Sequence, residues 1–138
     1  MPRILAIDYG TKKTGLAVTD PLQIIAQPLE TVPTVGLWDY LTDYLGREQV
    51  ECIVVGEPLH MDGSPAQIHH LVVGLERKLK RTYPDIEVVL QDERMTTREA
   101  RDIVLQSVSS RKRRRDKTLL DKVSATLILQ AYMNENRW

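Results

Sequence analysis

The sequence predicts an α/β protein with a mixed sheet of about five strands flanked by helices. Two apolar runs, at residues 4–7 and 53–55, contain no polar residue, which is typical of strands buried on both faces of a sheet. Apolar residues at helical spacing separate the later strands, which favours right-handed crossover connections. The expected element order is therefore β-β-β-α-β-α-β-α-α.

The first strand ends on a carboxylate, Asp8, which is followed by a turn with Gly10 and Gly15. Residues 16–18 come soon enough to pair with the first strand as a hairpin. A carboxylate placed where a core strand reaches the surface needs a cation or a hydrogen-bond donor, because its desolvation is costly. Asp8 therefore either closes an Asx-turn on the amides of Gly10 and Thr11 or belongs to a functional site.

The remaining elements follow from short apolar runs, helical spacing and capping residues. We expect strands at residues 24–26 (ending near 28 or continuing to 32), 53–55 and 86–90, and helices at 33–47, 64–82, 96–106 and 120–133. Ser64 is expected to cap its helix, with Pro65 in the first turn. Residues 108–117 have no periodicity and predict a basic loop. The first, fourth and fifth strands are expected to be central, with their carboxyl ends at one edge.

Length and composition predict a single globular domain that covers residues 1–138. The 138 residues are 42% hydrophobic and 28% charged, which is enough to bury a core. We expect no signal peptide, no membrane-spanning segment and no membrane partner. The single cysteine, Cys52, excludes an internal disulfide and favours a cytoplasmic setting. The 19 basic residues balance the 19 acidic ones, so net charge does not indicate a nucleic-acid partner.

Carboxylates fall at equivalent places, the ends of the strands that are expected to be central. Asp8 ends the first strand, Glu57 follows the fourth, and Asp92 and Glu93 follow the fifth. If these strands are parallel neighbours, the side chains meet at the edge where α/β sheets bind ligands. Asp121 is a further candidate, because its spacing from apolar residues puts it on the packed stripe of the last helix.

Carboxylates that converge repel one another and raise each other's pKa unless a cation lies between them. Oxygen ligands without a histidine–cysteine set favour Mg²⁺ or Mn²⁺ over zinc. Paired hard cations serve phosphoryl transfer, in which one activates water and the other stabilises the leaving oxygen. Each acid also has a structural alternative. Asp121 fits a helix N-terminal turn, Glu57 an exposed loop, and Asp92 with Glu93 a loop tip paired with Arg94.

Basic residues could form a positive rim around this acidic centre and hold phosphates there. The candidate nucleic-acid contacts are Lys12, Arg94, Arg98, Arg101, Arg111, Arg113 and Arg114. A solvated helix face or a charged loop is the alternative meaning of such runs. Tyr9, next to Asp8, either stacks on a base or packs in the structure.

Four ordered motifs resemble the YqgF/RuvX family of bacterial RNase H-like proteins. They are DYGTKxxGLA from Asp8, VGxPLxMDG from Val55, DERMTTxxA from Asp92 and DKVSAxLILQxY from Asp121. Together they extend over nearly the whole chain. Members of this family are described as Holliday-junction resolvases or as nucleases that mature the 5′ end of pre-16S rRNA.

The resemblance implies an RNase H-like fold and a metal-dependent nuclease with Asp8, Glu93 and Asp121 as its metal-binding catalytic acids. Glu57 is then auxiliary, because many relatives have an apolar residue at that place in the motif, and Asp92 is auxiliary as well. Lys12 and Arg94 would contact phosphate. The leading hypothesis is a Mg²⁺- or Mn²⁺-dependent endonuclease of structured nucleic acid that processes pre-16S rRNA, with ribosomal precursor particles as partners.

Three alternatives stay open at this point. Resolution of branched DNA at Holliday junctions would require a dimer, and the oligomeric state is left open. The first hairpin also resembles the phosphate loop of actin-like and sugar-kinase ATPases, which need two such domains. Finally, a non-catalytic nucleic-acid- or ribosome-binding module would bind in a salt-dependent manner without cleavage.

Overall fold

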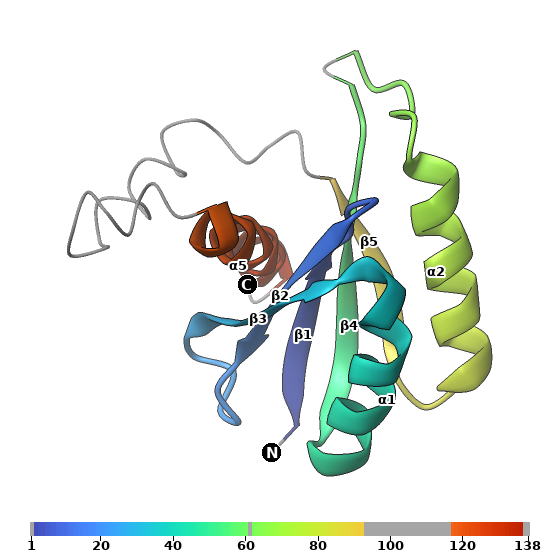
Figure 1. Ribbon diagram of the computed structural model, residues 1–138. Coiled ribbons are helices and arrows are strands. Elements are labelled where there is room, and N and C mark those ends of the chain that lie inside the picture. Colours follow the sequence, from blue (N-terminus) through green and yellow to red (C-terminus); the bar gives the residue numbers. More distant parts are fainter. Residues whose placement is uncertain (1, 61, 93–116, 137–138) are drawn as a thin grey trace.

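The computed structural model describes residues 2–60, 62–92 and 117–136, with side chains over the same ranges except 117–123. Its strands are β1 (Arg3–Asp8), β2 (Lys13–Thr19), β3 (Ala26–Pro33), β4 (Val50–Glu57) and β5 (Glu87–Asp92). Its helices are the 3₁₀ turn η1 (Thr34–Gly36), α1 (Leu37–Arg47), α2 (His69–Thr82) and α5 (Lys117–Asn136). The sheet lies between α1 and α2 on one side and α5 on the other (Figure 1).

The five described strands form one mixed sheet in the order β3-β2-β1-β4-β5. β1 pairs antiparallel with β2 and parallel with β4, and β4 pairs parallel with β5. The α/β class, the mixed sheet and the parallel arrangement of the first, fourth and fifth strands are therefore confirmed. The central position expected for the fifth strand is wrong, because β5 lies at an edge of the described sheet. Only Val88 and Gln91 of its six residues are buried, whereas the interior strand β1 has four buried residues in a row.

Alternate residues of β1 enter two separate cores. Leu5 and Ile7 pack in the cluster that includes α1 and α2, whereas Ile4 and Ala6 pack in the cluster formed with α5. All four are buried, with exposed fractions of 8% or less. The unbroken apolar run at the start of the chain therefore has the two-sided burial that it predicts.

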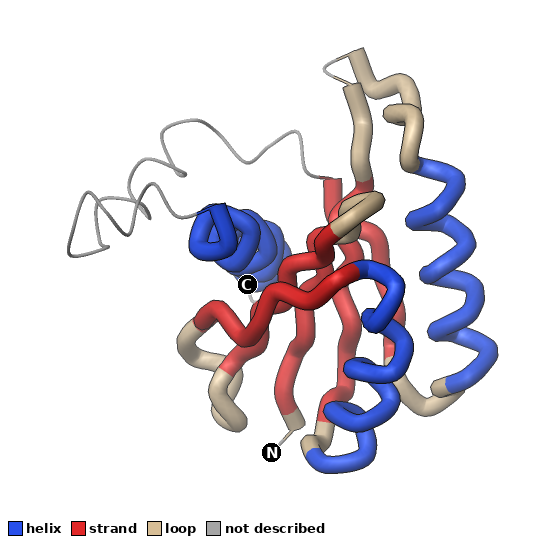
Figure 2. The backbone as a smooth tube through the Cα atoms, viewed as in Figure 1, coloured by secondary structure: helices blue, strands red, loops and turns tan. Residues whose placement is uncertain are grey.

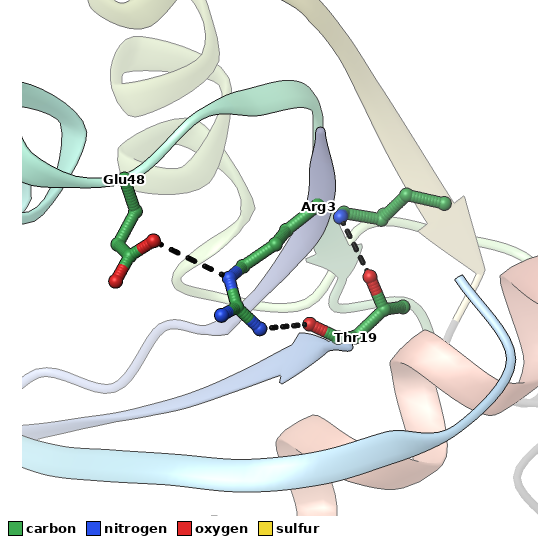
Figure 3. A network of polar contacts seen from close by, with 4 residues as sticks. Arg3, Thr19 and Glu48 are labelled. Carbon is green, nitrogen blue, oxygen red and sulfur yellow. Dashed lines mark hydrogen bonds and ion pairs between the residues drawn. The ribbon is translucent and has the colours of Figure 1, made fainter. Parts of the chain in front are cut away.

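A polar network fixes the amino end of β1 (Figure 3). The Arg3 guanidinium donates to the Thr19 carbonyl at 2.9 Å and lies 3.5 Å from a carboxylate oxygen of Glu48. The Thr19 hydroxyl oxygen accepts a hydrogen bond from the Ile4 amide at 2.9 Å, and Thr19 is fully buried. These contacts join β1 to β2 and to the segment before β4, so that the strand is held at the end opposite Asp8.

β3 begins later than the apolar run predicts. Its first residue is Ala26, and the side chains of Ile24 and Ile25 are 58% and 62% exposed. The Asp20 carboxylate accepts the amides of Ile24 and Ile25, each at 2.7 Å, which holds the segment in a turn. These backbone hydrogen bonds, that of Ile25 first, lower the pKa of Asp20. The expected strand at residues 24–26 is therefore wrong in its start, and its continuation to residue 32 is confirmed.

α2 begins at His69, so the expected cap at Ser64 is wrong. The amide and the hydroxyl of Ser64 both donate to Asp62 Oδ1, at 2.8 and 2.6 Å, and so close a turn instead of a helix. Leu59 and Pro65 form an isolated antiparallel bridge within the same loop, which is drawn in tan between β4 and α2 in Figure 2. This loop extends from the carboxyl end of β4 before the chain turns into the helix.

Two further expectations concern residues that the structure does not describe, wholly or in part. The expected helix at residues 96–106 lies outside the described residues, as does the expected basic loop up to residue 116. The last helix is longer at both ends than the expected 120–133, since it occupies Lys117–Asn136. No helix in the described ranges is long and apolar enough to cross a membrane.

Candidate active site

Asp8 ends β1 on the face of the sheet that α5 covers. It has the same position in the strand alternation as Ile4 and Ala6, which both pack in the α5 cluster. Its partner on β2 in the antiparallel register is Gly15, so no side chain of β2 stands opposite the carboxylate. The acid predicted from the first motif is therefore at the carboxyl end of a central strand, opposite a glycine of β2.

α5 brings the backbone of Asp121 to the same face of the sheet. Ala125 is fully buried in the α5 cluster, together with Leu129 and Met133. Asp121 precedes Ala125 by four residues and so lies one helical turn earlier on the same side of α5. Its side chain is outside the described residues. Its role as a metal ligand stays a prediction.

Glu57 leaves the sheet on the other face. It has the same position in the alternation as Ile53 and Val55, which pack in the cluster of α1 and α2. Its Oε2 atom lies 2.9 Å from His69 Nε2 at the start of α2, and both side chains are about three-quarters buried or more, at 27% and 20% exposure. The structure thus pairs Glu57 with a histidine and does not bring it to the face that holds Asp8.

Asp92 is the last residue of β5 and lies opposite Glu57 in the parallel register. Its place in the alternation matches that of Val88 and Leu90, which also belong to the α1–α2 side. Both auxiliary acids therefore stand at the carboxyl edge but on the face away from α5. Their auxiliary role stays a prediction.

The other predicted site residues fall on segments that the structure does not describe. These are Glu93, Arg94, Arg98, Arg101, Arg111, Arg113 and Arg114. Lys12 is described and is exposed in the turn after β1. Within the described ranges, no group of three or more histidine, cysteine, aspartate or glutamate residues is placed to hold a metal ion. Of the three acids expected to bind metal, only Asp8 has a described side chain.

Thr34, which no motif indicated, fixes the turn after β1. Its hydroxyl donates to the Gly10 carbonyl at 2.7 Å, and its amide donates to the Lys12 carbonyl at 2.8 Å. The buried hydroxyl of Thr14 lies 2.9 Å from Thr34 Oγ1 and must be the donor, because the Thr34 proton is already used. A Cβ at Gly10 would lie 2.3 Å from the Lys13 carbonyl oxygen, so this tight turn requires glycine.

Solved resolvases share the architecture. The structure of Fowlpox virus resolvase with substrate Holliday junction DNA matches with a TM-score of 0.62 and 11% identity, over 96% of this chain and 97% of that one. Thermus thermophilus RuvC in complex with a Holliday junction substrate matches with a TM-score of 0.56 and 17% identity, over 99% and 97% of the two chains. These likenesses define the fold as RNase H-like.

Sequence comparison gives the family. A family model described as "RuvX: Holliday junction resolvase" matches residues 2–135, and the chain belongs to this family. A Flavobacterium johnsoniae protein named "Putative pre-16S rRNA nuclease" is 45% identical over 138 residues, which is 100% of each chain. A Porphyromonas gingivalis protein of the same name is 47% identical over 134 residues, 97% of each chain. Fold and family together place the chain among the nucleases, enzymes that hydrolyse phosphodiester bonds.

Proposed function

We propose that this chain is a divalent-metal-dependent endonuclease of structured nucleic acid that matures the 5′ end of pre-16S rRNA in the cytoplasm. The observation that carries the proposal is the place of Asp8, at the carboxyl edge of a central strand of an RNase H-like sheet, on the face that α5 covers. The choice of RNA rests on full-length relatives at 45% and 47% identity that bear that name.

The metal-binding acids in this proposal are Asp8, Glu93 and Asp121, with Mg²⁺ or Mn²⁺ as the cation. Asp121 precedes the buried Ala125 by one helical turn, on the side of α5 that packs on the sheet. Glu93 comes two residues after Gln91 in the sequence. The Gln91 side chain lies on the α5 side, where its amide donates a hydrogen bond to the Glu135 carboxylate of α5 at 3.1 Å. When bound, a hard divalent cation lowers the pKa of a water molecule and stabilises charge on the leaving oxygen.

The protein's own groups hold the substrate around these acids. Lys12 is exposed in the turn that Thr34 fixes, and in this proposal its ammonium contacts a phosphate close to Asp8. Arg94, with the further arginines expected to contact nucleic acid, would extend this positive rim. We assign the whole of residues 1–138 to one such domain.

The direct test compares Asp8→Asn with the matched control Asp85→Asn, an exposed aspartate in the turn between α2 and β5. Both variants and the wild type are assayed on pre-16S rRNA and on a four-way DNA junction, with and without Mg²⁺ or Mn²⁺. We expect Asp8→Asn to lose on the order of 10²-fold or more in cleavage, as when a stabiliser of transition-state charge is removed. RNA binding should survive, and Asp85→Asn should cleave like the wild type. Unchanged cleavage by Asp8→Asn rejects the site.

A second candidate is resolution of Holliday junctions, which the description of the matching family favours. Symmetric cutting of a four-way junction needs two copies of the chain related by a twofold axis. The same assay distinguishes the candidates, since a resolvase makes paired symmetric cuts in the junction and leaves the rRNA precursor intact. A non-catalytic module would bind both substrates with steep salt dependence and cleave neither.

A further inference from the structure

A small cavity of about 220 Å³ opens beside the carboxyl edge, on the face of the sheet opposite α5. It is lined chiefly by Tyr9, Trp38, Leu71, Gly74, Leu75 and Lys78. This volume is below the roughly 300 Å³ at which pockets for drug-sized ligands begin, so it suits one ring system rather than a larger molecule. We call it the edge pocket.

The edge pocket is tied directly to the candidate active site. Tyr9 follows Asp8 in the chain, and consecutive Cα atoms are only about 3.8 Å apart. The two side chains leave on opposite faces, since Tyr9 packs against the core of α1 and α2. Thr34, which fixes the turn after β1, also lines the pocket. The edge pocket and the Asp8 carboxylate therefore lie on opposite faces of the sheet at the same end of β1.

The chemistry of the walls combines apolar surface with one cation. Lys78 Nζ lies 3.9 Å from the centroid of the Trp38 ring, a cation–π contact that holds the ammonium at the rim. Lys78 is exposed and makes no ion pair with a carboxylate of the described residues, so its donors stay available. Leu71 is 40% exposed, so part of its apolar surface is open to a ligand in the pocket.

We infer that the edge pocket binds one unpaired base of the substrate strand, next to the phosphodiester that is cut. Tyr9 stacks on the base, and Lys78 contacts a neighbouring phosphate. An aromatic wall beside a cation is the arrangement by which proteins hold single-stranded nucleic acid without reading its sequence. The inference deepens the proposed function and rests on it for the nature of the ligand. A nucleic-acid strand is the occupant that matches both the ring-sized volume of the pocket and the Lys78 ammonium at its rim.

Gly74 offers a way to fill the pocket without disturbing the fold. A Cβ built at this exposed helical position meets nothing within 4 Å. Gly74→Leu should therefore fold and occupy the pocket with its own side chain. Gly46, in α1, is also exposed with nothing within 4 Å of its Cβ, and it does not line the pocket. Gly46→Leu is thus the matched control for adding a leucine to an open helical glycine.

The test measures binding of single-stranded RNA that carries 2-aminopurine at one position at a time, with the proteins in an Asp8→Asn background so that cleavage is suppressed. We expect one position to show quenched fluorescence on binding. Gly74→Leu should abolish that quenching and weaken binding roughly 5- to 150-fold, the range that stacking of one base contributes. Gly46→Leu should behave like its parent. RNA with an abasic site at the quenched position should bind Gly74→Leu and its parent equally.

Two results would overturn the inference: equal affinity and equal quenching for Gly74→Leu and its parent, or a loss of affinity that persists with the abasic RNA. The second would mean that the pocket takes something other than a base. Cleavage is scored separately in proteins with an intact Asp8. Cleavage by the wild type together with unaffected binding by Gly74→Leu rejects the pocket and leaves the proposed function standing. Base-dependent binding without any cleavage supports the pocket and rejects the nuclease proposal.

Discussion

The two faces of the sheet are packed with side chains of different size. On the α5 face, Ala6, Ala17 and Ala125 are all fully buried. On the α1–α2 face the fully buried residues include Leu41 and Leu79. Because the distance between packed elements depends on the side chains at their contact, the alanines let α5 lie close to the strands. Large residues such as Leu129 and Met133 are buried on the α5 face as well, so the two faces differ at the positions of these alanines, where added volume would be least tolerated.

The largest expected effect on stability comes from truncating a large residue on the α1–α2 face. Leu41→Ala removes a side chain with 0% exposure and should lower the free energy of unfolding by about 2–5 kcal/mol. Urea unfolding measures this change. Below the unfolding transition, cleavage per folded molecule should stay near that of the wild type. A large loss of activity in fully folded protein would show that the two faces are not functionally separate.

The converse change adds volume on the α5 face. Ala125→Leu should cost about 1–3 kcal/mol, because overpacking forces the helix or its neighbours to shift. It should also reduce cleavage in folded protein, since Asp121 is on the same helix one turn away. The control is Gln130→Leu, at an exposed position of α5. Normal activity in a folded Ala125→Leu protein would show that cleavage does not depend on close packing of α5 against the sheet.

The buried thiol of Cys52 on the α5 face should make the free energy of unfolding depend on pH. Burial raises the pKa of its thiol from 9.0 to about 11, and the thiol donates to the Tyr132 hydroxyl at 3.6 Å. The folded protein keeps the proton that the unfolded chain loses above pH 9, so this stabilisation is present below pH 9 and is lost between pH 9 and 11. The stability difference between wild type and Cys52→Ala should shrink by up to about 2–3 kcal/mol over that range. A difference that is constant with pH would contradict the buried neutral thiol.

Small effects are expected for two polar side-chain pairs, one of which joins Glu57 and His69 on the α1–α2 face. Glu57→Gln keeps a hydrogen bond to His69 and should change stability by about 1 kcal/mol or less. Asp43→Asn is the exposed counterpart, because Asp43 pairs with Arg47 on the surface of α1 at 2.9 Å. It should change stability by no more than about 0.5 kcal/mol. A loss of several kcal/mol in Glu57→Gln would show that the Glu57 carboxylate is a structural centre of that face.

Much of this architecture can be predicted from the sequence, because strand burial is encoded in runs of residues. The two-sided burial of β1 and the hairpin after Asp8 follow from local pattern alone. The order of strands does not, and β5 was therefore expected at the centre although it is an edge strand. The turn at Asp20 was expected, but not its extent, since the Asp20 carboxylate also accepts the amides of Ile24 and Ile25. The turn in which Asp62 accepts the Ser64 amide was missed.

The candidate site was predictable to a different degree for each acid. Asp8 was identified from its place at a strand end. The face on which Glu57 lies could have been found by counting alternation from Val55, a signal that is present in the sequence. The contacts of Thr34 with the turn after β1 had no such signal, because they join residues about 20 positions apart through the tertiary fold.

The most direct test asks whether the reaction takes place on the α5 face or on the α1–α2 face of the sheet, at the carboxyl ends of its strands. The measurement is the Mg²⁺-dependent cleavage rate of pre-16S rRNA by Asp8→Asn and by Glu57→Gln, two single changes from carboxylate to amide on opposite faces. We expect a loss on the order of 10²-fold or more for Asp8→Asn. For Glu57→Gln we expect at most a loss on the order of 10-fold, as for a supporting group. Equal losses, or a greater loss for Glu57→Gln, would contradict a reaction centre on the α5 face.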